Sequence, residues 1–300
     1  MDLVTDVLEV SGVSSTVGAR IEAGAGWSLA LDDYPGAALH AVTGGSAWLS
    51  LPGRDPLELV TGDIALIPAV VPHRLSDAPG PTATPCAQMP ASGVIQVGTP
   101  PVRTRIVTVH YDCDHEARTQ ILGTLPDFLL MRAGSAAAGL DDTVRMIGRE
   151  LTHPQFATTA LLNSLVDVML IQLLRAWIPT RPPELRGTWL GAFEDPIVQQ
   201  ALEHLHADPA RPWTTAALAE AIAVSRATLS RRFPAAMGQS PGAYLTQWRM
   251  DLAANRLRKT HDSIETIAAA VGYGSAPAFV RAFARSRGKS PARYRLTRSL

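Results

Sequence analysis

The sequence has few cysteines and almost no lysines. Its 300 residues include only Cys86 and Cys113, too few for a disulfide scaffold and typical of a protein in a reducing cytoplasm. Lysine occurs only as Lys259 and Lys289, so arginine carries nearly all the basic charge. The guanidinium group suits phosphates and guanine edges better than an ammonium group does. The hydrophobic content of 46% and charged content of 18% exclude wholesale disorder.

The sequence also lacks the features of a secretory signal and of a membrane span. The first ten residues, MDLVTDVLEV, are acidic and have no basic flank before a continuous apolar run. The longest apolar stretch, residues 159–177, is interrupted by Asn163, Asp167, Gln172 and Arg175. A spanning helix rarely carries such a charge without a partner. We therefore expect a cytoplasmic protein that is not exported and has no membrane partner.

The charge is neutral overall but unevenly distributed. Residues 196–300 hold 15 basic and 6 acidic residues, and residues 1–195 hold the other 12 basic and 21 acidic residues. A basic module attached to an acidic body indicates that one part binds a polyanion and the other has a different task.

The basic third of the chain contains an internal repeat at an offset of 50 residues. The offset aligns Arg231, Phe233, Gly238, Ser240, Pro241 and Tyr244 with Arg281, Phe283, Gly288, Ser290, Pro291 and Tyr294. Each copy predicts a short helix, a tight turn, and a second helix that begins after a serine cap, Ser225 or Ser275. The glycines predict the helix ends, and each Ser-Pro pair predicts the start of a further helix. This is a helix-turn-helix pattern written twice.

The segment between the copies, residues 241–259, has apolar residues at helical spacing. A helix of this length spans roughly 27 Å at 1.5 Å per residue. It can therefore place two reading helices near one turn of duplex, ~34 Å, apart.

Residues 196–297 resemble the DNA-binding domain of the AraC/XylS family of bacterial transcription regulators, because both copies and the spacer match its signature. The resemblance implies that the base-facing positions are Ala227, Ser230 and Arg231 in the first copy and Ala276, Pro277 and Arg281 in the second. It further implies DNA contacts from Arg226, Thr228, Arg232, Arg249 and Ser275.

Two features depart from the family pattern. Pro234 follows Phe233 inside the first reading helix, where the missing amide and the ring predict a kink. Ala227, Ala276 and Pro277 have no hydrogen-bonding side chains. Base readout is therefore expected to depend on few polar groups, together with thymine methyl groups or DNA shape.

Residues 20–76 alternate short β-like runs with turn residues, which predicts a small antiparallel barrel or jelly roll. The segment from Gly62 to Pro68, followed by Pro72 and His73, resembles the second half of a cupin motif, and His40 lies in a stretch that resembles the preceding hairpin. This second resemblance covers residues 5–112 and implies a sensor domain.

His40 and His73 are the candidate effector-binding residues. The cupin resemblance places both at the same mouth of the barrel, so we expect their rings to converge. Val42 stands where a catalytic cupin has a second histidine, and no glutamate follows at the family spacing, so a complete oxygenase-type metal site is missing. Three alternatives remain: a small organic effector, a zinc, copper or nickel ion, and a hydrogen-bonded pair that binds nothing. A metal at these two histidines would need a further ligand such as Cys113, His110 or Cys86. No cofactor is required by the sequence.

Residues 79–101 are rich in proline and small residues, which predicts a loop that carries Cys86. Residues 102–111 predict a strand that returns toward Cys113. The two thiols form either a redox switch or an unreactive pair.

From residue 119 the pattern predicts helices, at residues 141–151 and 155–178. The second has an apolar face too wide for a lone surface helix, so it packs on the body or on a second subunit. We expect a homodimer held partly by Leu162, Val166, Met169 and Leu173.

The sequence thus predicts an α+β chain in four parts. Residues 1–118 form a cupin-like jelly-roll barrel, 119–178 a helical segment, 179–195 a linker, and 196–300 an all-α domain with two helix-turn-helix motifs.

The functional hypothesis is a cytoplasmic, nucleoid-associated transcription regulator that is not an enzyme. Its partners would be double-stranded promoter DNA, a small-molecule or metal effector, a second copy of the chain and, if it activates transcription, RNA polymerase. The alternative is a metal-dependent cupin enzyme that carries a DNA-binding tail, which a redox metal with three or more protein ligands would indicate. A structural nucleoid protein, with weak sequence preference, is the third hypothesis.

Overall fold

A computed structural model describes residues 5–7, 10, 14–31, 36–68, 71–80, 93–112, 125–134, 138–180 and 189–296. The chain divides into two compact units. The sheet unit comprises Val13–Cys113 and Leu125–Arg181, and the helical unit comprises Pro182–Leu300 together with Met1–Gly12 and Asp114–Thr124. The sequence-based boundaries differ from this division, because they assign residues 1–12 and 114–118 to the barrel and 119–124 to the helical segment, whereas the division groups all three with the helical unit. Cys86 and Cys113 lie outside the described residues, and so does their predicted pairing.

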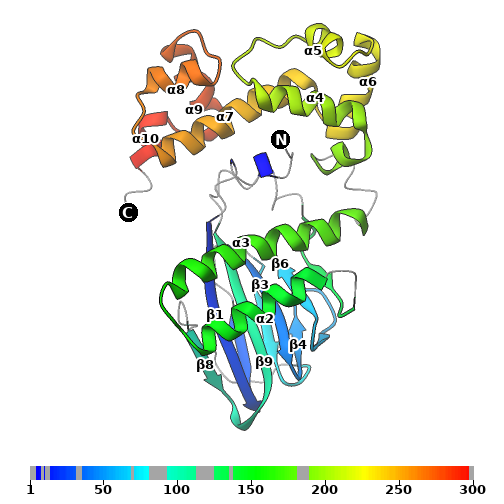
Figure 1. The fold of residues 1–300 in the computed structure, drawn as a ribbon, viewed down its shortest axis with the longest axis vertical. Helices are drawn as coiled ribbons and strands as arrows, with labels where there is room; N and C mark the ends of the chain where they lie inside the picture. The colour runs from blue at the N-terminus through cyan, green and yellow to red at the C-terminus, as the bar shows by residue number, and fades with distance from the viewer. Residues whose placement is uncertain are drawn as a thin grey trace. The chain divides into compact units, whose positions relative to one another are not determined.

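The described strands of the sheet unit form two sheets that do not close into one barrel (Figure 1). The strands are β1 (Ser14–Ala25), β2 (Ser28–Leu31), β3 (Ala37–Gly44), β4 (Ser46–Ser50), β5 (Leu57–Val60), β6 (Ile64–Ile67), β7 (His73–Ser76), β8 (Gly93–Val97), β9 (Thr99–Asp112) and β10 (Leu129–Met131). The larger sheet has the order β10-β6-β3-β9-β1-β8, and the smaller has the order β2-β7-β4-β5. All pairings are antiparallel except β1 with β8. The sequence predicted a barrel or a jelly roll, and two facing sheets of this kind correspond to the jelly roll. The predicted α+β class is confirmed.

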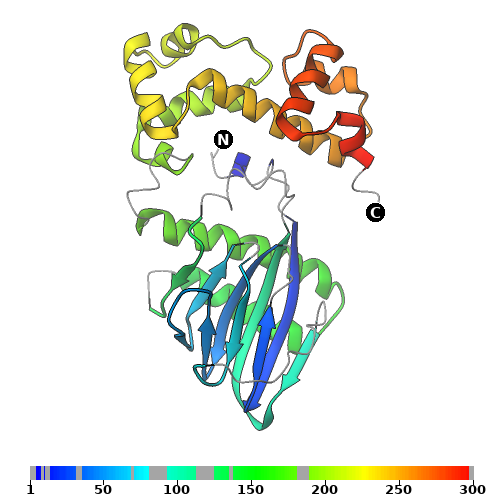
Figure 2. The ribbon, with the colours of Figure 1, turned by 180° about the vertical axis from the view of Figure 1, so that it is seen from behind.

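One apolar core lies between the two sheets and draws on both. It includes Ile21 and Val42 from the larger sheet and Leu29, Leu49 and Leu75 from the smaller one. The first six residues of β3 are buried without alternation. Burial without alternation is typical of a strand that is covered on both faces. The core covers one face of the larger sheet, and helices cover the other (Figures 1 and 2).

The covering helices are α2 (Ala138–Thr152) and α3 (Thr158–Trp177), both close to their predicted bounds. They contact each other and strand β1, and the Tyr111 hydroxyl on β9 donates a 3.1 Å hydrogen bond to the Val166 carbonyl on α3. Helix α3 is long and apolar enough to cross a membrane by length and composition, but its apolar face packs inside the sheet unit like that of a core helix. The short 3-10 helix η2 (Ile178–Thr180) follows it.

This packing corrects the predicted dimer contacts. Leu162, Val166, Met169 and Leu173 are each at most 6% exposed within a single chain. Their side chains fill the space between α3 and the rest of the sheet unit, so they are not available to a second subunit. The prediction of these four interface residues is wrong, whereas the homodimer itself stays a prediction.

The helical unit contains two helix-turn-helix modules at opposite ends of one long helix (Figure 1). Its elements are η4 (Trp189–Glu194), α4 (Pro196–Ala207), α5 (Thr215–Ala221), α6 (Arg226–Met237), α7 (Pro241–Lys259), α8 (Ile264–Ala270), α9 (Ala276–Arg287) and α10 (Pro291–Leu296). The linking helix α7 has the predicted bounds. Gly238 and Gly288 end α6 and α9 with φ of 69° and 70°, a left-handed conformation that glycine adopts without strain.

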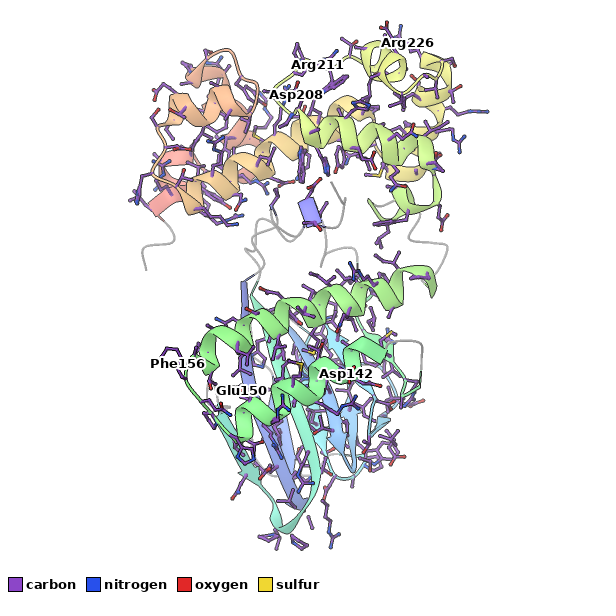
Figure 3. All side chains as sticks on the ribbon, in the orientation of Figure 1. Asp142, Glu150, Phe156, Asp208, Arg211 and Arg226 are labelled. Carbon is purple, nitrogen blue, oxygen red and sulfur yellow. The ribbon has the colours of Figure 1, made fainter. Side chains whose placement is uncertain are left out.

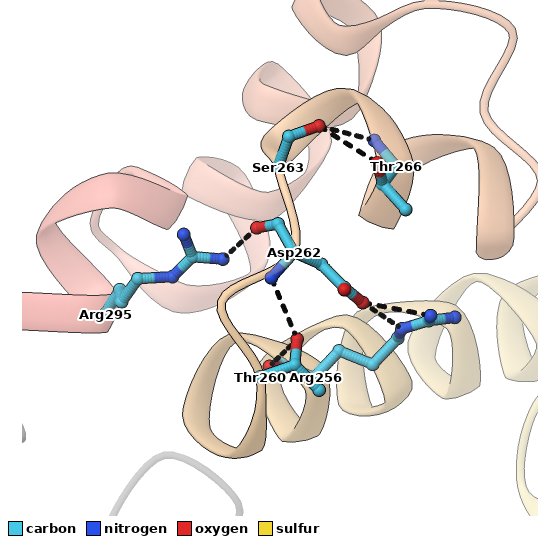
Figure 4. Close-up of polar contacts among 6 residues, drawn as sticks. All are labelled: Arg256, Thr260, Asp262, Ser263, Thr266 and Arg295. Carbon is cyan, nitrogen blue, oxygen red and sulfur yellow. Dashed lines mark hydrogen bonds and ion pairs between the residues drawn. The ribbon is translucent and has the colours of Figure 1, made fainter.

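Polar contacts fix the junction between α7 and α8 (Figure 4). Arg256 on α7 donates hydrogen bonds of 3.2 and 3.0 Å to the Asp262 carboxylate, and Arg295 on α10 donates to the Asp262 carbonyl at 2.6 Å. Ser263 then caps α8 by accepting from the Thr266 amide at 3.1 Å. These contacts hold the second module in a defined orientation on α7.

The first module is held to α7 by Arg249. Its guanidinium donates to the carbonyls of Pro209 and Arg211 at 2.7 and 2.9 Å, in the loop between α4 and α5. A Cβ added at Gly272, in the second module, would lie 2.6 Å from the Ala210 carbonyl oxygen of the same loop and 2.8 Å from Nη2 of Arg249. The two modules therefore meet directly at this loop.

A segment from the start of the chain packs on the helical unit. The Asp6 carboxylate accepts a 3.0 Å hydrogen bond from Nδ1 of His206 on α4, and the Tyr244 hydroxyl contacts Nε2 of that ring at 2.7 Å. The His206 ring stacks on Trp248 with centroids 3.9 Å apart. Arg258 near the other end of α7 donates to the Val10 carbonyl at 3.2 Å. The segment thus contacts both halves of the helical unit.

Candidate nucleic-acid interface and sensor site

The predicted reading helices, α6 and α9, each begin at a serine cap. The Ser225 hydroxyl accepts from the Thr228 amide at 3.0 Å, and the Ser275 hydroxyl accepts from the Ala278 amide at 3.4 Å. The predicted inward stripes are confirmed, because Leu229 on α6 and Phe279 and Phe283 on α9 are fully buried. Each module therefore presents the opposite face of its second helix to solvent.

The tight turn inside each module uses a left-handed residue. Gly272 occupies this position in the second module with φ of 79°, and Ala223 occupies it in the first with φ of 55°. The alanine side chain makes this left-handed conformation less favourable than it is for glycine, but Ala223 adopts it all the same. The turns connect α5 to α6 and α8 to α9, and the two helices of each pair pack on each other, as in a helix-turn-helix.

Most of the predicted DNA-contacting side chains lie on the solvent face of these helices. Arg226, which Figure 3 labels at the start of α6, and Arg231 are exposed, as is Arg281 on α9. The other exposed members of the predicted set are Ala227, Ser230, Ser275 and Pro277, and Thr228 and Ala276 are half-buried. The solvent face of α6 and α9 therefore carries the positive charge of Arg226, Arg231 and Arg281.

Two of the predicted contacts have partners within the protein. Arg232 donates a 2.7 Å hydrogen bond to the Asp195 carboxylate, which also caps α4, and Arg249 binds the carbonyls described above. Both guanidinium groups therefore stabilise the helical unit. Their contacts with DNA stay predictions.

Pro234 does not end α6, which continues to Met237. Because proline has no N–H, the Ser230 carbonyl receives no helical hydrogen bond from this position. The Pro234 carbonyl still accepts from the Gly238 amide at 2.9 Å, so the last turn is intact.

The sensor site consists of two imidazoles that meet between the sheets. His40 lies on β3 of the larger sheet and His73 on β7 of the smaller one, and their Nε2 atoms are 2.9 Å apart. The predicted convergence of the two rings is therefore confirmed. His40 is fully buried, and its Nδ1 atom lies 3.0 Å from the Thr108 hydroxyl on β9.

One arrangement of protons is consistent with the contacts of His40 with Thr108, of His40 with His73, and of His73 with Val71. Nδ1 of His73 lies 2.9 Å from the Val71 carbonyl, which only accepts, so this nitrogen carries the proton. In a neutral ring Nε2 of His73 is then an acceptor, and Nε2 of His40 donates to it. Nδ1 of His40 in turn accepts from the Thr108 hydroxyl. The result is a continuous hydrogen-bond chain that links the two sheets.

Burial favours the neutral form of two imidazoles at this site, those of His40 and His110. It lowers the pKa of His40 well below the usual value, and the neighbouring His73 and His110 lower it further. Burial also lowers the pKa of His110, on β9, to about 4, and His73 adds to this effect. Three imidazoles thus lie close enough to influence one another's protonation.

The described residues do not complete a metal site. Among them, no group of three or more His, Cys, Asp or Glu side chains is placed to hold an ion. Stable zinc sites have three or four protein ligands, and the pair supplies two. Zinc or copper at His40 and His73 therefore stays a prediction, as does a contribution from Cys113, which lies outside the described residues.

Sequence reasoning missed several residues that organise these sites. Thr108 orients His40, and Arg287 pairs with Asp251 in the helical unit. Asp6 binds His206 from a position 200 residues away, which no local pattern signals. The repeat itself gives a clue to Arg287, because the equivalent residue in the first copy is the buried Met237.

Two family models match the chain. A cupin model matches residues 2–179, and a helix-turn-helix domain model matches residues 218–297. These matches agree with the sheet unit and with the two modules of the helical unit.

Relatives match over nearly the whole chain. A putative AraC-like transcription regulator of Streptomyces antibioticus is 35% identical over 301 residues, and another of Streptomyces lividans is 34% identical over 300 residues, each covering 98% of both chains. The HTH-type transcriptional regulator MtrA of Neisseria gonorrhoeae is 27% identical over 300 residues, with the same coverage. All three are named as transcription regulators. The chain belongs to the AraC-like family of DNA-binding transcription regulators, with a cupin domain ahead of its helix-turn-helix domain.

Proposed function

We propose that this regulator binds specific promoter sites and that an effector bound in the sheet unit controls its activity. Arg231 and Arg281 occupy equivalent exposed positions on α6 and α9 and support the first part. Helix α7, at ~28 Å for its 19 residues, separates the modules by somewhat less than one turn of duplex. Both reading helices can therefore enter successive major-groove segments on one side of the DNA, while arginines neutralise phosphates.

The observation that carries the second part is the buried His40–His73 pair. Buried polar groups that only satisfy each other add little stability relative to an apolar core, so two imidazoles at this place favour a role in binding. A ligand that takes either Nε2 atom breaks the hydrogen bond between β3 and β7. Binding would thereby change how the two sheets are joined, which gives the effector a route to the rest of the unit.

The same proposal includes a homodimer in the cytoplasm, and RNA polymerase as a partner if the protein activates transcription. Four of the seven exposed large apolar residues of the described chain lie on the α2–α3 hairpin, namely Met146, Phe156, Leu161 and Val168. Phe156 stands at the turn between the two helices (Figure 3). Exposed apolar residues on one helical hairpin favour a protein contact there, and we propose these four residues in place of the buried ones assigned from the sequence.

The effector proposal is tested by promoter occupancy under varied growth conditions. We expect His40→Leu/His73→Leu to bind promoter DNA in vitro like the parent but to lose the change of occupancy with conditions in cells. His153→Leu, which alters an exposed histidine after α2, is the matched control. Elemental analysis of untagged protein separates a metal effector from an organic one. A double variant that responds as the parent does would contradict the assignment of this site.

A further inference from the structure

The two reading helices present equivalent positions but different chemistry. The offset of 50 residues maps buried Leu229 onto Phe279 and buried Phe233 onto Phe283. It also maps exposed Arg231 onto exposed Arg281. The same offset therefore pairs the remaining surface positions of α6 and α9.

Three polar residues on α6 are replaced by apolar residues on α9. The pairs are Arg226 with Ala276, Thr228 with Ala278, and Ser230 with Val280. A fourth pair, Ala227 with Pro277, is apolar on both helices and exposed on both. From 276 to 281, Arg281 is the one side chain that can form hydrogen bonds, whereas residues 226–231 contain four such side chains.

The backbone at the start of α9 also offers few N–H groups that could donate hydrogen bonds to DNA. Pro277 has no N–H, and the Ala278 amide already donates to the Ser275 hydroxyl at 3.4 Å. Neither position has an amide left for a base or a phosphate. The exposed surface of Pro277 and the half-exposed surface of Ala276 therefore form an apolar tip at the end of α9 that a helix-turn-helix directs into the groove.

In the major groove, the apolar feature that distinguishes one base is the C5-methyl group of thymine. We propose that thymine methyl groups in contact with Ala276 and Pro277 specify the half-site read by α9, and that Arg281 supplies its one hydrogen-bonded base contact. The half-site read by α6 is specified by hydrogen bonds from Arg226, Ser230 and Arg231. The two halves of the operator accordingly differ in sequence and in the kind of contact by which the protein recognises them. This inference rests on the proposed promoter binding.

Replacement of thymine by deoxyuridine tests the inference, because it removes the methyl group and keeps the base pair. Footprinting with the full chain first locates a site, and the half that loses protection with Arg281→Ala is assigned to α9. Each replacement at a contacted thymine in that half should weaken binding about fourfold, which corresponds to ~0.8 kcal/mol for one buried methyl group. Replacements in the α6 half should change the affinity by less than about twofold.

Protein variants provide the matched comparison. Ala276→Gly should reduce the preference for thymine over uracil at one position of the α9 half, and Ala227→Gly on α6 should leave that preference unchanged. Equal affinity for thymine and uracil throughout the α9 half, at a site that is otherwise protected, would overturn this inference and leave promoter binding intact. The absence of any discrete protected site would overturn both.

Discussion

A buried ion pair in the second module permits a quantitative test of how the repeat is built. The Arg287 guanidinium on α9 donates to the Asp251 carboxylate on α7, and both side chains are buried. The offset of 50 maps Arg287 onto Met237, and the offset of 49 that aligns α5 with α8 maps Asp251 onto Leu202. The first module therefore has two buried apolar residues where the second has the ion pair.

The pKa of Asp251 indicates the sign of the effect. Burial raises the pKa of this carboxyl group, and the attraction of Arg287 offsets the increase only in part. A buried ion pair whose desolvation outweighs its attraction is typically no more stabilising than a well-packed apolar pair. Arg287→Met alone leaves a buried carboxylate without this guanidinium and should reduce the free energy of unfolding by about 3–5 kcal/mol. The double variant Asp251→Leu/Arg287→Met, which copies the first module, should lie within about 1 kcal/mol of the parent or above it.

Urea denaturation of the full chain measures these differences, and hydrogen exchange of α9 peptides assigns the affected transition to the second module. Met237→Ala, at the position of the first module that is equivalent to Arg287, measures how much free energy of unfolding is lost when a buried apolar side chain is truncated there. The reasoning is refuted if the double variant is as unstable as Arg287→Met, because the pair would then be required for stability and not merely tolerated.

Three further predictions concern binding, acid stability and the turn. Arg231→Ala and Arg281→Ala should each weaken operator binding by ~1–3 kcal/mol and relax the base preference in different halves of one site. Identical footprints for both variants and the parent would contradict the positions assigned to the two arginines. His110 has a lowered pKa of about 4 in the folded chain, so the unfolded chain binds the proton first as the pH falls. This group alone should therefore reduce the free energy of unfolding of the sheet unit by up to about 3 kcal/mol between pH 6.5 and about 4. His110→Gln should remove that part of the pH dependence in urea titrations at several pH values and leave the part that comes from His40. Gly272→Ala should cost more than ~1–2 kcal/mol in thermal unfolding, because it combines a left-handed alanine with contact at 2.6 Å to the Ala210 carbonyl, whereas Ala223→Gly should be nearly neutral.

Local and repeated features were predictable from the sequence. The serine caps, the glycine ends and the buried phenylalanines of the two modules follow from short-range spacing that appears twice. The meeting of His40 and His73 followed from the cupin resemblance, because the motif fixes which strand each residue occupies. These features depend on contacts that the local sequence pattern specifies.

Features that depend on tertiary partners were not predictable. An apolar face such as that of α3 fits a sheet or a second subunit equally well, and only the structure shows that the sheet unit covers it. An arginine such as Arg232 or Arg249 has the same sequence signal whether it contacts DNA or a carbonyl. The contact between Asp6 and His206 joins residues with no relation in sequence.

Genome-wide mapping of bound DNA is the measurement that tests the central claim most directly. The parent chain should occupy a limited set of promoters. Arg231→Ala/Arg281→Ala should lose those peaks, because two missing base contacts cost ~2–6 kcal/mol together. Arg54→Ala, at an exposed arginine of the sheet unit, should retain them. Uniform, promoter-independent occupancy by the parent, or unchanged peaks in the double variant, would contradict the account.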